Sequence, residues 1–189
     1  MANFNPFIDK IYLDSLRELC LMQGKLRHYK KGEFFLRSGE SPKYFGFIES
    51  GYFNYFVVDS LDNERITGFA LCNTLAGDFY SSLHNVPSLN NLRAASASSV
   101  WVISVSEIRD FLDKHPDIRH VMAEELFRTA HERFINLYRQ SPKERYVELL
   151  NRCPDILQNI TLKELASYLQ ITPTHLSRIR KEIRCGDKA

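Results

Sequence analysis

The sequence predicts an α+β chain with an antiparallel β jelly roll first, a long helix next and a helix-turn-helix at the C-terminal end. Three observations predict this: short Tyr, Phe, Val and Ile runs punctuated by glycine, a later apolar stripe with helical spacing, and two capped helical segments near the C-terminus. We expect three parts. Residues 1–115 form the barrel with flanking helices, residues 116–140 the long helix and residues 141–189 the C-terminal helical domain.

The composition is that of a globular chain. Of the 189 residues, 44% are hydrophobic and 25% are charged, which is enough apolar material for a core. The N-terminal stretch MANFNPFIDK lacks the apolar run of a signal peptide. No stretch reaches the roughly 18 apolar residues that would cross a bilayer. We therefore expect a cytoplasmic protein without a membrane partner.

The cysteines stand singly. They are Cys20, Cys72, Cys153 and Cys185. None belongs to a CxxC pair, and no histidine follows one at the spacing of zinc ligands. We expect no disulfide, no metal site and no iron–sulfur cluster, because a cluster requires cysteines that are grouped.

A cupin-like enzyme is one alternative, since jelly rolls also host metal chemistry. Such an enzyme needs two or three histidines and a carboxylate that converge inside the barrel. The strand region has only His28 and His84, and the sequence has no HxH pair. We therefore predict that the chain is not an enzyme and has no catalytic residues.

Residues 7–22 place apolar side chains every three or four positions, which predicts a short amphipathic helix that Gly24 ends. The strand region, residues 25–105, then shows turn signals about every 8 to 12 residues. Its glycines stand where we expect strands to turn or bulge. They are Gly32, Gly39, Gly46, Gly51, Gly68 and Gly77.

Beyond the strand region the apolar spacing lengthens. SEIRDFLDKHP predicts a short helix that Pro116 stops. A second helix from about residue 117 to 140 would be roughly 36 Å long. A small barrel cannot cover that length, so we expect part of its apolar stripe to hold a homodimer together; packing against its own barrel is the alternative. The residues expected at the dimer contact are Leu126, Ala130, Phe134 and Leu137.

Ser141 and Pro142 interrupt the helical pattern, because proline lacks an N–H and disfavours helical geometry in the residue before it. We place a hinge there. The segment PKERYVELLNRC then predicts one more helix, which Pro154 ends. Its expected inward-facing residues are Tyr146, Val147, Leu149 and Leu150.

The segment TLKELASYLQITPTHLSRIRKEI predicts two helices joined by a tight turn. Thr161 and Glu164 can form a capping box at the first helix, and Thr172 followed by Pro173 can start the second. Gln170 occupies the turn position where glycine is usual. Apolar or small residues stand where crossed helices touch. They are Leu165, Ala166, Leu169, Ile171, Leu176 and Ile179.

Positive charge gathers at the C-terminal end. Lys and Arg number 9 against 6 Asp and Glu in residues 141–189, but 16 against 17 in residues 1–140. A basic end suits a polyanion. If the second helix enters a major groove, Arg178 is best placed to contact guanine, while the later cations suit phosphates. The predicted contacts to double-stranded DNA are Thr172, Pro173, Thr174, His175, Ser177, Arg178, Arg180, Lys181 and Arg184.

Taken together, the barrel glycines, SPKERYVELL and ITLKELASYLQITPTHLSRIRKEI resemble the Crp/Fnr family of bacterial transcription regulators. Members of this family are similar to the cyclic AMP receptor protein. The resemblance implies a homodimer that binds a palindromic operator, responds to a small-molecule effector in the barrel and contacts RNA polymerase. A sensor that signals through protein contacts instead of DNA stays open as an alternative.

The run GDFYSSLHNVPSLNNLRAASASSVWVISVSEIRDFL resembles the family's ligand-binding cassette. The family offers a Gly-Glu pair there for the ribose and an arginine for the cyclic phosphate. In this sequence Gly77 and Asp78 occupy the positions of the Gly-Glu pair, and Ser88 occupies the position of the arginine. Arg93 is nearby but aligns elsewhere on the strand. A buried phosphate without a cation is costly, so we expect little or no cyclic AMP binding. The expected effector pocket comprises Gly77, Asp78, Ser88 and Asn90. The sequence does not identify the effector.

Overall fold

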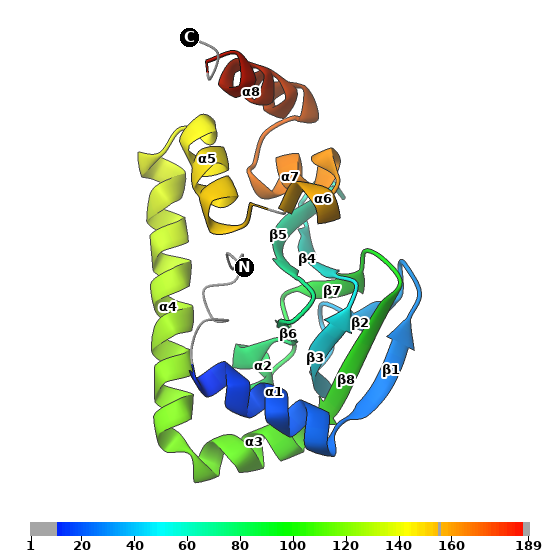
Figure 1. Cartoon of the computed structure of the whole chain (residues 1–189). Coiled ribbons are helices and arrows are strands. Elements are labelled where there is room, and N and C mark those ends of the chain that lie inside the picture. Colours follow the sequence, from blue (N-terminus) through cyan, green and yellow to red (C-terminus); the bar gives the residue numbers. More distant parts are fainter. Residues whose placement is uncertain (1–10, 155, 187–189) are drawn as a thin grey trace. The chain divides into compact units, whose positions relative to one another are not determined.

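The computed structural model describes residues 11–154 and 156–186. Within them the chain divides into two compact units, one ending at Thr129 and the other beginning at Ala130. The first unit contains the β strands and the second contains the C-terminal helices (Figure 1). The long helix α4 (Pro116–Arg139) runs from the first unit into the second.

The strands of the first unit form two antiparallel sheets. In the described residues one sheet has the order β1-β8-β3-β6 and the other the order β2-β7-β4-β5. The strands are β1 (Lys25–Tyr29), β2 (Phe34–Leu36), β3 (Tyr44–Ser50), β4 (Phe53–Val58), β5 (Glu64–Ala70), β6 (Leu75–Ala76), β7 (Asn91–Ala94) and β8 (Ser98–Ser104). This is the jelly-roll arrangement that the sequence predicted.

Two clusters of buried apolar side chains stabilise the first unit. One includes residues of both sheets, among them Ile48, Phe53 and Val100, and all three are 0% exposed. The other joins helices to the outside of β3. In it, Leu16 of α1 (Ile11–Gln23) and Leu112 of α3 (Val105–Lys114) lie in the same cluster as Ile118 and Met122 at the start of α4. Removing this apolar surface from water is the main stabilising contribution to such a unit.

Most of the barrel glycines lie at turns, but Gly46 corrects our prediction. Gly46 lies within β3, and a Cβ placed on it would be 2.6 Å from Cγ1 of Val100. Its role is therefore close packing against β8. Gly68 fits the prediction, since the β4–β5 register shifts between Tyr55 and Phe56, opposite Gly68. The glycines with positive φ are Gly32, Gly39, Gly51 and Gly77.

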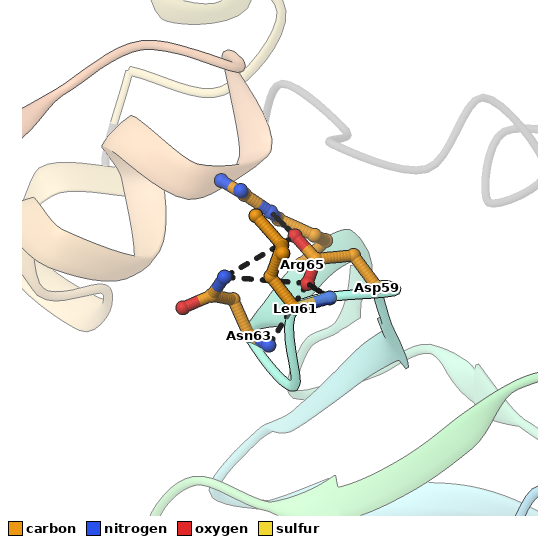
Figure 2. Close-up of polar contacts among 4 residues, drawn as sticks. All are labelled: Asp59, Leu61, Asn63 and Arg65. Carbon is orange, nitrogen blue, oxygen red and sulfur yellow. Dashed lines mark hydrogen bonds and ion pairs between the residues drawn. The ribbon is translucent and has the colours of Figure 1, made fainter.

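Asp59 organises the hairpin between β4 and β5 (Figure 2). Its carboxyl group accepts hydrogen bonds from the backbone N–H groups of Asn63 and Leu61, both at 2.9 Å, and from Nε of Arg65 at 2.7 Å. The Asn63 backbone, followed by Arg65, lowers the pKa of Asp59 from 3.8 to about 2. These hydrogen bonds therefore favour the ionised form of Asp59 in the folded hairpin.

The helices of the first unit follow the sequence pattern, and the described chain has two helices that the sequence did not predict. Helix α1 begins the described chain at Ile11, so residues 7–10 of the predicted helix lie outside the described residues. Helix α3 begins with a capping box of Ser104 and Glu107, and α4 begins at Pro116. The additions are α2 (Phe79–His84) in the first unit and α6 (Ile156–Asn159) in the second, and both are too short to show a helical apolar period.

The second unit contains α5 (Pro142–Arg152), α6, α7 (Leu162–Tyr168) and α8 (Pro173–Gly186). Tyr146 and Leu149 of α5 are buried as predicted. Val147 is 37% exposed, so our inward placement of it was wrong. The reason is geometric, because one residue step turns a helix by about 100° away from the buried face. Among the described helices, none is long and apolar enough to cross a membrane.

Candidate nucleic-acid interface and effector cassette

Helices α7 and α8 form the predicted helix-turn-helix, and the predicted caps are present. Oγ1 of Thr161 accepts from the backbone of Glu164, whose carboxyl group accepts in turn from the backbone of Thr161. Oγ1 of Thr172 accepts from the N–H of His175 at 3.2 Å, in the first turn of α8. Between the helices, Gln170 has a φ of 58°, the left-handed conformation expected of the residue at that turn.

The crossing of these two helices is closely packed. Leu165, Ala166 and Leu176 are 0% exposed, and Leu169 and Ile179 are 3% exposed. Ile171, in the turn, is partly buried. The apolar positions selected from the sequence therefore form the core of the motif, with the small side chain of Ala166 inside it.

The burial of Leu176 and Ile179 turns the opposite side of α8 toward solvent. Arg178 lies between these two buried residues in the sequence and is exposed. Arg180 is half-buried near Tyr146; burial raises the pKa of Tyr146, and the charges of Arg180 and Arg184 oppose that rise. The other exposed members of the predicted contact set are Thr172, Pro173, Thr174, His175, Ser177, Lys181 and Arg184. These side chains are free to meet a polyanion, and their contact with DNA stays a prediction.

Arg145 connects the two sides of the helix break at Ser141. Its guanidinium group donates to the carbonyl of Gln140 at 2.8 Å and to the carbonyl of Leu169 at 3.0 Å. Gln140 in turn donates from Nε2 to Glu148 at 2.8 Å. The break between α4 and α5 is thus confirmed, but it is spanned by hydrogen bonds, and the boundary between the two compact units lies earlier, at residues 129–130.

Helix α4 exposes large apolar side chains along its length. Phe127 is 72% exposed, Phe134 56% and Tyr138 79%. Phe127 and Phe134 are seven residues apart, which places them about two turns apart on one side of the helix. Of the other residues predicted at a dimer contact, Ala130 is exposed, while Leu126 and Leu137 are partly buried.

In the cassette, the backbone of Gly77 binds a partly buried tyrosine. The hydroxyl of Tyr55 donates to the carbonyl of Gly77 at 2.9 Å and accepts from its N–H at 3.1 Å. Burial raises the pKa of Tyr55 to about 12, which keeps the phenol protonated. A Cβ on Gly77 would lie 2.3 Å from Cδ2 of Phe45, and its φ is 154°. Both facts require glycine here.

Asp78 caps α2 and also reaches Ser88. One carboxyl oxygen accepts from the N–H of Ser81 at 3.0 Å, and the other from the hydroxyls of Ser81 at 2.9 Å and Ser88 at 2.6 Å. The Ser88 oxygen accepts from the N–H of Asn90 at 3.0 Å, and Asn90 Oδ1 accepts from Thr67 at 3.3 Å. The structure therefore brings together the four residues selected from the sequence. It adds Tyr55, Thr67 and Ser81. Ser81 could have been found as the third residue after a capping aspartate, whereas Tyr55 and Thr67 carry no local signal.

Comparisons with known proteins agree with this architecture. Residues 26–115 match the family model of the cyclic nucleotide-binding domain. FixK2 from Bradyrhizobium japonicum has a TM-score of 0.76 and 18% identity, over 88% of this chain and 87% of that one. A CooA mutant from Carboxydothermus hydrogenoformans has a TM-score of 0.68 and 12% identity, over 93% of this chain and 85% of that one. The c-di-GMP-responsive global regulator CLP from Xanthomonas campestris has 0.64 and 14%, over 92% of both chains. No curated protein sequence matches the chain.

The chain shares the fold of these three proteins, and its residues 26–115 match the cyclic nucleotide-binding domain. In its cassette, Arg93 and Arg109 donate hydrogen bonds to groups of the protein itself, whereas a phosphate site presents its cations to the ligand. Arg93 of β7 donates to the carboxyl group of Glu64 on β5 at 2.7 Å. Arg109 of α3 donates to the carbonyl of Ser82 at 2.6 Å. Within the described part of the chain, no three His, Cys, Asp or Glu side chains are grouped as a metal site.

Proposed function

We propose that the chain is a homodimeric, sequence-specific DNA-binding regulator of transcription without enzymatic activity. The observation that carries this proposal is the division of α8 into a buried side and an exposed side: Leu176 and Ile179 are buried, while Arg178 and its neighbours face solvent. Solved structures with this fold include the global regulator CLP and the sensor domain of the transcriptional regulator DNR, which supports the same conclusion.

Helix α8 has the dimensions of a recognition helix. Its 14 residues span about 21 Å, and a major groove admits a single helix. Arg178 is in the second turn, where a bidentate contact with guanine is within reach. Lys181 and Arg184 follow toward the far end of the helix and suit phosphate oxygens. Base contacts would supply specificity, and phosphate contacts would supply salt-dependent affinity.

A second copy of the chain is the partner that α4 favours. The exposed aromatic side chains Phe127, Phe134 and Tyr138 recur at intervals of seven and four residues, as in a helix seam that pairs with its own copy. A two-fold dimer would present two α8 helices to half-sites about one helical turn, roughly 34 Å, apart. Palindromic operators follow from that symmetry.

Selection of bound sequences from random duplex DNA at a fixed salt concentration tests the proposal. The expected result is one enriched palindrome. The variant Arg178→Ala should lose the enriched base at one position of each half-site. The control Lys43→Ala removes an exposed cation from the first unit and should leave the enriched sequence unchanged. Recovery of unselected DNA only, at all salt concentrations, would contradict the proposal.

A further inference from the structure

The polar groups of the cassette loop, residues 77–90, bind one another. Asp78 and Ser88 are ten residues apart in the sequence, and their side chains meet at 2.6 Å. Ser88 is 1% exposed and its hydroxyl also contacts the backbone of Asn90, so it is saturated with partners. The Gly77 N–H and C=O are both bound to the Tyr55 hydroxyl. A ligand that used these groups would first have to break bonds within the protein.

An anionic ligand would gain little in return. A buried phosphate needs charged or multiple N–H donors to offset its loss of hydration. Arg93, which follows the loop in the sequence, is engaged with the carboxyl group of Glu64, and Arg109 is engaged with Ser82 and Asn85. The group that does face Ser88 is the carboxyl group of Asp78, which is itself an acceptor.

The same loop is attached to the helix that we propose for dimerisation. Nε of Arg109, on α3, donates to the carbonyl of Ser82 on α2, and Nη2 donates to Asn85, which follows α2. Phe79 and Leu83 of α2 pack against the core cluster that contains Met122 of α4. Helix α3 is followed by α4 after a single residue. Helix α2 and the start of α4 therefore pack on one shared core, so we expect a shift of α2 to reach α4.

We propose that the Asp78–Ser88 hydrogen bond closes the cassette from within, so that the protein holds its DNA-binding conformation without a small anionic effector. This inference rests on the proposed function, because it concerns how that function is regulated. A ligand changes a conformational equilibrium only if it binds the two states differently, and a cassette closed by its own side chains offers a cyclic nucleotide no such difference.

Operator binding by nucleotide-free protein gives the first test. The dialysed wild-type protein, with no nucleotide absorbance, should bind the selected operator specifically. Cyclic AMP, cyclic GMP and cyclic di-GMP should each change its Kd by less than about twofold. An increase in affinity of about tenfold with any of them, or with cell extract, would overturn the proposal. Protein that binds no DNA under any condition would contradict the proposed function instead, and the second test would then decide the closure alone.

Native-state hydrogen exchange of the α2 amides gives the second test. Ser88→Ala removes one hydrogen bond to Asp78, and exchange should accelerate by about fivefold or more. Asp78→Asn keeps one oxygen that can cap the Ser81 N–H, but the NH2 group that replaces the other oxygen cannot accept from the Ser88 hydroxyl. This variant should therefore also accelerate exchange. Ser82→Ala is the matched control, because Ser82 is a buried serine of the same helix whose Oγ has no hydrogen-bond partner. Equal exchange in Ser88→Ala and Ser82→Ala would refute the closure, as would slower wild-type exchange on addition of cyclic AMP.

Discussion

The guanidinium group of Arg145 on α5 donates to the backbone carbonyl of Leu169, at 3.0 Å, at the end of α7. The same group holds the carbonyl of Gln140 after α4. One guanidinium group therefore joins the end of α4 to the end of α7, which are far apart in the sequence. Leu169 begins the turn that connects α7 to α8. We therefore expect the position of α8 to depend on this side chain.

Arg145→Ala should lower the free energy of unfolding by about 2 kcal/mol, because hydrogen bonds from a charged donor contribute about 1.5 to 3 kcal/mol. Urea unfolding followed by circular dichroism measures this. Lys143→Ala is the control, since the Lys143–Glu182 pair, 3.6 Å apart, is exposed and contributes about 0 to 1 kcal/mol. Equal losses in the two variants would show that Arg145 does not join these segments.

We expect different side chains of α8 to contact the bases and the phosphates of DNA. Arg178→Ala should cost about 1 to 3 kcal/mol on the cognate duplex and relax preference at one base position. Arg184→Ala should weaken all duplexes alike and reduce the salt dependence by about one unit of slope. Binding to cognate and scrambled duplexes across a salt series separates the two patterns. If Arg178→Ala lowers both duplexes equally, the side of α8 that reads bases has been misassigned.

The exposed aromatic residues of α4 should hold the dimer. The double variant Phe127→Ala and Phe134→Ala should sediment as a monomer at micromolar concentration, because aromatic anchors dominate the energy of such contacts. It should also lose affinity for the palindrome. Leu61→Ala is the control, since Leu61 is 78% exposed on the β4–β5 hairpin. A double variant that remains dimeric would exclude this surface as the interface.

Asp59 should make the stability of the first unit depend on pH. The native pKa of about 2 lies below the ordinary value of 3.8, so the unfolded chain binds the proton more readily. The stabilisation is complete above pH 3.8 and is lost as the pH falls toward 2. Thermal melts from pH 6 to pH 2 should therefore show a smaller decline in Tm for Asp59→Asn than for the wild type. An equal decline in Tm for the two proteins would mean that Asp59 does not contribute to the pH dependence of stability.

Local sequence determined the elements whose signals are confined to a few residues. Thr161 with Glu164, and Thr172 before Pro173, identify the helix starts because a cap acts within one turn. The burial of Leu176 and Ile179 follows from helical spacing alone. The jelly roll follows from many short strands with turn glycines between them.

Tertiary structure decided what depends on distant segments. Gly46 looked like a turn glycine, but β8 brings Val100 against it. Val147 lies on the exposed side of α5, which only the packing of its neighbours could select. The sequence placed Asp78 and Ser88 in one cassette, but only the folded chain joins their side chains and brings Tyr55 from another strand to Gly77. A contact between distant residues depends on the path of the whole backbone, and short-range patterns do not encode that path.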